Sequence, residues 1–194
     1  MKHLAIFASG RGSNAEAIIR FFQNHPKISV ALIVTNNPDA GVIQIARQYH
    51  IPYLVISKKQ LSEGTVLLKT LQEKHIDFIV LAGFILLLPP YLIDRYPGRI
   101  VNIHPALLPK FGGKGMYGIK VHEAVLKAGE RQTGITIHYV DEQYDHGAII
   151  LQKTCAIQED ETPGSLMKKV QQLEHYHYPR VIESLILKEE TLHS

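Results

Sequence analysis

The stretch HLAIFASGRGSNAEAIIRFF, residues 3–22, decides the fold class of this chain. Residues 3–8 form a near-continuous apolar run, which is typical of a parallel strand that is covered on both faces. Gly10 and Gly12 then mark a turn, and residues 15–22 have the apolar spacing of a helix. Free backbone N–H groups and the positive end of the helix dipole meet at such a turn, and the glycines let a phosphate approach. The stretch therefore predicts an anion site, with a tight turn that binds nothing as the alternative.

The alternation of strand and helix continues along the chain. Further strands are expected at residues 28–34, 53–56, 77–82 and 99–104, with helices at residues 39–50, 61–74 and 91–96 between them. Repetition at this spacing predicts one α/β domain, residues 1–194, built on a doubly wound, mostly parallel, Rossmann-like sheet of about seven strands. Residues 134–140 alternate two unlike faces, which indicates a late antiparallel strand at the edge of the sheet. A strand at residues 148–156 and helices at 119–128 and 162–187 complete the pattern, and Pro179 is expected to kink or interrupt the last helix.

Composition disfavours several classes of partner. The net charge is +3 and the basic residues are scattered, so the sequence has no footprint for nucleic acid. The single cysteine, Cys155, allows no intramolecular disulfide bond and fits a reducing compartment. The longest apolar run, residues 78–88, is too short to span a bilayer, and no targeting signal is recognisable. We therefore expect a cytoplasmic protein that acts on small molecules, without a membrane or nucleic-acid partner.

A second stretch, RIVNIHPALL at residues 99–108, carries the candidate chemistry. Asn102 and His104 are two residues apart on a predicted strand, so both side chains project from the same face. Pro105 should end the strand at His104, which places both groups where open α/β sheets bind ligands. A single histidine at a strand end is more often structural, and Asp145 lies in a loop where aspartate commonly bonds its own backbone. Asp145 becomes a partner for His104 only if the fold brings the two together.

Spacing disfavours two further kinds of site. Gly10 and Gly12, with an alanine three positions on, fit the loose dinucleotide pattern, but no acidic residue follows the second strand before Asp39. A Rossmann-type nucleotide-binding module is therefore the weaker interpretation. His175 and His177 are two residues apart, and residues with that spacing do not share a face of a helix. No metal site is predicted.

Five motifs occur in one order along the chain: SGRGSN at residues 9–14, LAGF at 81–84, NIHPALLP at 102–109, DEQYDHG at 141–147 and QQLEH at 171–175. This ordered set resembles the phosphoribosylglycinamide formyltransferase family of folate-dependent enzymes. Members of that family transfer the formyl group of 10-formyltetrahydrofolate to the amine of glycinamide ribonucleotide in purine biosynthesis and release tetrahydrofolate. The resemblance implies the formyltransferase fold, a formyl-folate co-substrate, no metal, and a monomer or homodimer. Another transferase or hydrolase that uses formyl folate remains the alternative.

The resemblance also implies roles for individual residues. Asn102, His104 and Asp145 would be catalytic: the amide and a charged ring would stabilise the developing oxyanion, and the carboxylate would orient and charge the ring. His146 stands where many members have a glycine, and residues 111–118 form a longer glycine-rich loop than is usual. The implied ribonucleotide-binding residues are Gly12, Ser13, Asn14, Gln171, Gln172, Leu173 and Glu174, and the implied folate-binding residues are Ile85, Leu86, Leu87, Leu88, Asn102, Asp141, Glu142, Gln143, Tyr144 and Asp145.

Overall fold

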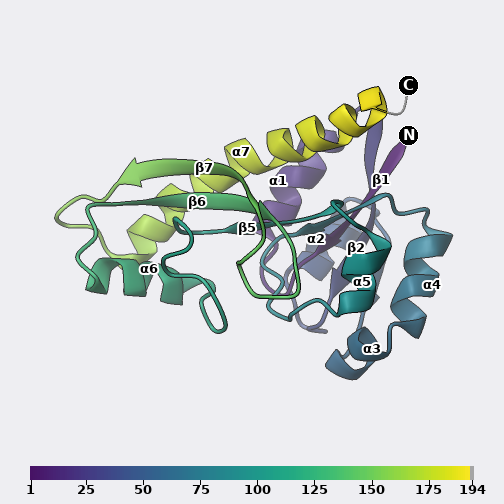
Figure 1. Ribbon diagram of the computed structural model, residues 1–194, viewed down its shortest axis with the longest axis horizontal. Helices are drawn as coiled ribbons and strands as arrows, with labels where there is room; N and C mark the ends of the chain where they lie inside the picture. The colour runs from purple at the N-terminus through teal and green to yellow at the C-terminus, as the bar shows by residue number, and fades with distance from the viewer. Residues whose placement is uncertain (193–194) are drawn as a thin grey trace.

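The computed structural model describes residues 1–192 and contains a seven-stranded sheet with helices on both faces (Figure 1). Its strands are β1 (Lys2–Phe7), β2 (Ile28–Thr35), β3 (Tyr53–Val55), β4 (Phe78–Leu81), β5 (Ile100–His104), β6 (Gln132–Tyr139) and β7 (Ile149–Ala156). They lie in the order β3-β2-β1-β4-β5-β6-β7. The first five strands pair in parallel, whereas β6 is antiparallel to both β5 and β7. The predicted α/β fold with a mostly parallel sheet is confirmed.

Helices cover both faces of the sheet because the central strands are apolar on both sides. They are α1 (Ser13–Phe22), α2 (Val42–Gln48), α3 (Lys58–Glu63), α4 (Thr65–Glu73), α5 (Pro90–Arg95), α6 (Ile119–Lys127) and α7 (Pro163–Leu192). In β1, Leu4 and Ile6 belong to the core under α1, α2, α6 and α7, whereas Ala5 and Phe7 belong to the core under α3, α4 and α5. The apolar run at residues 3–8 thus serves two cores at once. Within residues 1–192, no helix is long and apolar enough to cross a membrane.

The helix expected at residues 61–74 is two helices, α3 and α4, which meet at Gly64. Ser57 and Gln60 form a capping box that starts α3 at Lys58, and Gly64 ends it with a φ of 76°. A Cβ at Gly64 would lie 2.8 Å from the ring of Tyr91, so the neighbouring helix α5 also requires a glycine there. The prediction of a single helix was wrong because the apolar spacing continues across Gly64, although the helix itself ends there.

Pro179 was predicted to kink or interrupt the last helix, and it does not interrupt it. Tyr178, the residue before the proline, is fully buried. Its hydroxyl lies 2.8 Å from the carbonyl oxygen of Leu81 and 3.1 Å from that of Val101, at the adjacent strands β4 and β5. These contacts hold the helix on the sheet beside the proline and offset the one backbone hydrogen bond that a proline removes.

The strand with two unlike faces, β6, lies inside the sheet and β7 lies at its edge, contrary to the prediction. The polar face of β6 is buried as well as the apolar one. Thr136 donates a hydrogen bond to the carbonyl oxygen of Ala106 at 2.7 Å and accepts one from the backbone N–H of Leu108 at 3.0 Å. The loop that follows β5 therefore covers this face, and the alternation in β6 marks a buried polar site instead of a solvent boundary.

Candidate functional site

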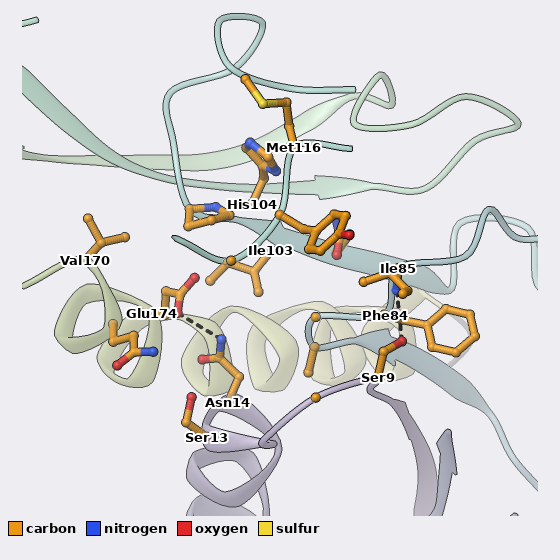
Figure 2. Close-up of a pocket in the computed structure, with 18 of the residues that line it drawn as sticks. Ser9, Ser13, Asn14, Phe84, Ile85, Ile103, His104, Met116, Val170 and Glu174 are labelled. Atoms are coloured by element: carbon orange, nitrogen blue, oxygen red, sulfur yellow. Dashed lines mark hydrogen bonds between the residues drawn. The ribbon is translucent and has the colours of Figure 1, made fainter. Parts of the chain in front are cut away.

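A cavity of about 460 Å³ opens at the carboxyl ends of β1, β4 and β5, beside the start of α1 (Figure 2). Ser9 follows β1, Gly83 follows β4 and His104 ends β5, and all three line the cavity. They meet because parallel strands end at the same edge of a sheet. The side chains of Val170 and Glu174 on α7 complete the wall (Figure 2). The glycine turn and the strand-end residues that the sequence singled out thus line one cavity.

The glycine turn has a shape that only glycine allows. Gly12 precedes α1 with a φ of 84°, and a Cβ there would lie 2.9 Å from the side chains of Val42 and Ile45 in α2. No side chain caps the N-terminus of α1, and Ser13 and Asn14 in its first turn line the cavity. The backbone N–H groups and the positive end of the helix dipole therefore face a space that suits an anion.

Charged groups in this part of the cavity are few and differ in sign. Arg11 is the only lysine or arginine that lines the cavity among the residues that the structure describes. Glu174 is 6% exposed and accepts a hydrogen bond from Nδ2 of Asn14 at 3.0 Å (Figure 2). Burial raises the pKa of Glu174 to about 7, although the bond from Asn14 opposes the shift. Within the described chain, Oδ1 of Asn14 is buried without a hydrogen-bond partner, so it is left for a ligand or water.

A second cavity of about 50 Å³ adjoins the first, on the side of the loop between β6 and β7. Its apolar wall comes from the segment after β4, including Leu86, Leu87 and Leu88. The backbone N–H of Ile85 donates to Oγ of Ser9 at 3.0 Å, which ties this segment to the end of β1 (Figure 2). The residues that line both cavities are Phe84, Asn102, Tyr144 and Asp145.

The Asn102 side chain is held by two partners at the junction of the cavities. Its Nδ2 lies 3.1 Å from Nε2 of His138, the residue opposite it in the ladder between β5 and β6, and donates to Oδ1 of Asp145 at 3.3 Å. The Nδ1 atom of His138 is 2.8 Å from the carbonyl oxygen of Tyr139. A carbonyl only accepts, so Nδ1 of His138 carries the hydrogen and Nε2 accepts from Asn102. Both hydrogens of the Asn102 amide are thus engaged within the protein.

The His104 ring is buried, with 3% of the residue exposed. Its Nε2 lies 2.7 Å from the carbonyl oxygen of Phe111 and therefore carries a hydrogen, while Nδ1 lies 3.4 Å from Oδ2 of Asp145. Burial lowers the pKa of His104, and the nearby Asp145 carboxylate opposes this shift without cancelling it. The carboxylate thus favours the charged ring, as expected, while loss of solvent has the larger effect on its pKa.

Asp145 reaches the site from the loop between β6 and β7, in a left-handed backbone conformation with a φ of 53°. Its Oδ2 accepts a hydrogen bond from the backbone N–H of Gly113 at 2.9 Å. Burial raises the pKa of this carboxyl, but its polar neighbours, among them the Gly113 N–H that donates to it, lower the pKa below its ordinary value. Asp145 is therefore a charged group that links two loops to His104, a contact that only the fold creates.

Most of the site residues predicted from the sequence line one of the two cavities, but four of them do not. Gln172 and Leu173 line neither cavity, because positions 171 and 174 share one face of α7 and the two between them do not. Asp141 and Glu142 also lie outside both cavities, and the Asp141 carboxylate instead contacts Nδ1 of His146 at 2.7 Å. The predicted residues that line a cavity are Gly12, Ser13, Asn14, Ile85, Leu86, Leu87, Leu88, Asn102, His104, Gln143, Tyr144, Asp145, Gln171 and Glu174.

Three further residues at the site were missed by the sequence analysis. His138 carried a signal, since it occupies a polar position in an alternating strand. Arg11 lies inside the glycine turn, and the interpretation of that turn considered only the glycines and the start of the helix. His122 lines the cavity from α6 and had no signal, because a histidine in a helix is common.

Within residues 1–192, no group of three or more histidine, cysteine or acidic side chains is arranged to hold a metal ion.

A family model described as formyl transferase matches residues 2–182. The chain therefore belongs to the formyl transferase family. Within that family it is similar to phosphoribosylglycinamide formyltransferases. It is 39% identical over 191 residues to the enzyme of that name from Bacillus subtilis, a match that covers 96% of this chain and 95% of the relative. The resemblance predicted from the five motifs is confirmed.

Other relatives carry the same name. The chain is 44% identical over 190 residues to the chloroplastic phosphoribosylglycinamide formyltransferase of Arabidopsis thaliana, a match that covers 95% of this chain and 65% of the relative. The chain thus spans somewhat less than two thirds of that plant protein, and 61% of the one from Vigna unguiculata. A solved structure of phosphoribosylglycinamide formyltransferase from Bacillus halodurans superposes with a TM-score of 0.89 at 41% identity, covering 98% of both chains.

Proposed function

We propose that the protein transfers the formyl group of 10-formyltetrahydrofolate to the primary amine of N1-(5-phospho-D-ribosyl)glycinamide, a step of purine biosynthesis, and releases tetrahydrofolate. The observation that carries this proposal is the position of Asn102 and Asp145 in the walls of both cavities. A group that passes between two bound molecules needs its catalytic residues at their boundary. His104 lies beside Asp145 at this boundary, with Nδ1 3.4 Å from the carboxylate.

The larger cavity suits the ribonucleotide. Its phosphate would bind at the N-terminus of α1, where Gly12, Ser13 and Asn14 present backbone N–H groups and Arg11 supplies a positive charge. The ribose hydroxyls would reach Glu174, with Gln171 one helical turn away. In this arrangement the amine of the substrate would point toward the strand ends.

The folate would bind on the side of the smaller cavity. Leu86, Leu87 and Leu88 offer an apolar wall for a flat heterocycle, and the loop that contains Gln143 and Tyr144 offers polar backbone groups opposite. The formyl group attached to the folate nitrogen would then lie at the junction, next to Asn102 and His104.

The chemistry follows from these positions. The amine nitrogen attacks the formyl carbon, a tetrahedral centre forms, and the bond between that carbon and the folate nitrogen breaks. Negative charge develops on the formyl oxygen, and a preorganised hydrogen-bond donor there typically contributes roughly a hundredfold to a thousandfold in rate. Asn102 would donate one of its Nδ2 hydrogens, and the bond to Asp145, at 3.3 Å, is the one we expect to be exchanged.

One proton leaves the attacking amine and one must reach the departing folate nitrogen. His104 would donate the proton to the folate nitrogen, for which its Nε2–H must exchange the Phe111 carbonyl oxygen for that atom. Although burial lowers its pKa, the oxyanion that forms beside the ring adds a negative charge and favours the imidazolium at that moment. Asp145, which is ionised and held in place by Gly113, stabilises the same charged ring. It would accept the amine proton through water and return it to Nδ1 of His104, so that one proton leaves the amine and one reaches the folate nitrogen.

We further infer a cytoplasmic enzyme whose 194 residues act as one domain, as a monomer or homodimer. The single cysteine, Cys155, is partly buried and its pKa is raised by burial, which suits a reducing compartment where it need not react. Gel filtration with light scattering would distinguish the monomer from the homodimer.

The activity can be tested by incubating the purified protein with both substrates and following tetrahydrofolate release. We expect release that depends on the ribonucleotide. Release without any amine would instead indicate a formyl-folate hydrolase, and no release with either combination would contradict the proposal. Replacing the ribonucleotide with the unphosphorylated riboside should reduce binding strongly if the turn at Gly12 holds a phosphate.

A further inference from the structure

His122 is a buried polar side chain that the proposed mechanism does not use. It lies in the first turn of α6, is 2% exposed, and lines the larger cavity. Its Nδ1 is buried without a hydrogen-bond partner among the residues that the structure describes. Buried imidazole nitrogens are normally paired, so an unpaired one in a cavity wall points to a bond with something that occupies the cavity.

The surroundings of His122 locate it within the site. It is close enough to His104 for the charge on that ring to affect it, and α6 packs against α7, which carries Glu174. It therefore lies near His104, on a helix that packs against α7. Burial, with a smaller contribution from His104, lowers the pKa of His122 to about 4, so the ring is neutral near pH 7.

A neutral imidazole has one donor and one acceptor, so one of its nitrogens can pair with either the N–H or the C=O of a secondary amide. The proposed substrate has such an amide between its ribose and its amine. We propose that His122 is a substrate-binding residue whose imidazole hydrogen-bonds this amide and so aims the amine at the formyl carbon. This inference rests on the proposed function, since it names the group of that substrate which the ring contacts.

The test uses two variants of His122 in the full-length protein. His122→Leu is similar in size and cannot form hydrogen bonds, and His122→Gln keeps a donor and an acceptor. Because Nδ1 of His122 has no partner to lose among the described residues, the leucine variant should melt at the same temperature as the parent or higher. Its dissociation constant for glycinamide ribonucleotide, measured by calorimetry, should rise about 5- to 30-fold, as expected for one or two lost hydrogen bonds. The glutamine variant should fall between leucine and the parent.

Thr133 supplies a matched control. It is 2% exposed, its Oγ1 is also buried without a partner in the described chain, and it lies on the face of β6 opposite Thr136 and outside the cavity. Thr133→Val should therefore leave ribonucleotide binding and turnover unchanged. Ribose 5-phosphate, which lacks the amide, should bind the parent and His122→Leu equally.

The outcomes separate this inference from the proposed function. If the parent protein fails to transfer the formyl group, the proposed function fails. If the parent is active and His122→Leu binds the ribonucleotide as tightly as the parent, the inference about His122 is overturned. It is also overturned if His122→Leu weakens only the binding of folate, or if it weakens the binding of ribose 5-phosphate as much as that of the ribonucleotide. If the leucine variant does not fold, the glutamine variant decides the same question. Weaker binding of the ribonucleotide with unchanged binding of ribose 5-phosphate supports the inference, and unchanged binding of both contradicts it.

Discussion

The substitution Glu174→Gln should stabilise the protein at alkaline pH, because it removes the cost of ionising a buried carboxyl. The Glu174 pKa is about 7 in the folded chain and 4.5 is its ordinary value, which we take for the unfolded chain. Between these values the folded state binds more protons than the unfolded state, so this group's contribution to stability is complete below about pH 4.5 and is lost as the pH rises through 7. The glutamine variant has no such loss, and its Oε1 can still accept from Asn14.

The magnitude follows from the size of the pKa displacement. At roughly 1.4 kcal/mol per unit, a displacement of about 2.5 units corresponds to about 3 kcal/mol of unfolding free energy at pH 8. At pH 5 the difference should be below about 1 kcal/mol, because Glu174 is then protonated in the folded chain. For a chain of this length, about 3 kcal/mol corresponds to a rise in melting temperature of about 6–12 °C.

Thermal and urea unfolding of the parent and Glu174→Gln at pH 5 and pH 8 would measure this difference. Glu161 is a suitable control, since its ion pair with Lys169 lowers its pKa and Glu161→Gln should shift stability in the opposite direction. If Glu174→Gln were no more stable than the parent at pH 8, or if its advantage were the same at both pH values, the reasoning from burial would be refuted.

The remaining predictions concern the site and its frame. His104→Ala should lower kcat by about 10²–10⁴-fold with the fold intact by circular dichroism, and near-normal turnover would exclude the proposed proton transfer. Asp145→Asn should lower the pKa of His104 further, because in the parent the carboxylate opposes the downward shift. An NMR titration of the ring that shows no change would mean that the two residues do not interact. Asn14→Ala should raise the KM for the ribonucleotide about tenfold and leave that for folate unchanged, whereas an effect on folate alone would overturn the assignment of the glycine turn. Gly12→Ala should cost about 1–3 kcal/mol of stability in urea unfolding, because the φ of 84° and the contacts at 2.9 Å both disfavour a side chain.

Local patterns were sufficient for most of the fold. Strand and helix positions followed from apolar spacing, and β5 ends at His104 as Pro105 requires. The errors arose where a contact between distant residues outweighs a local signal. Tyr178 holds α7 on the sheet past a proline, and Gly64 divides one apolar pattern because Tyr91 packs over it.

The sequence by itself determined the strand–turn–helix unit at residues 3–22 and the common face of Asn102 and His104, because both depend on neighbours within a few positions. Only the tertiary structure decided that Asp145 meets His104, since 41 residues separate them and a loop aspartate has many possible partners. It also decided that His104 has a lowered pKa and that Nδ1 of His122 is buried without a partner among the described residues. Those properties depend on how much solvent the surrounding elements exclude, and no short stretch of sequence specifies that.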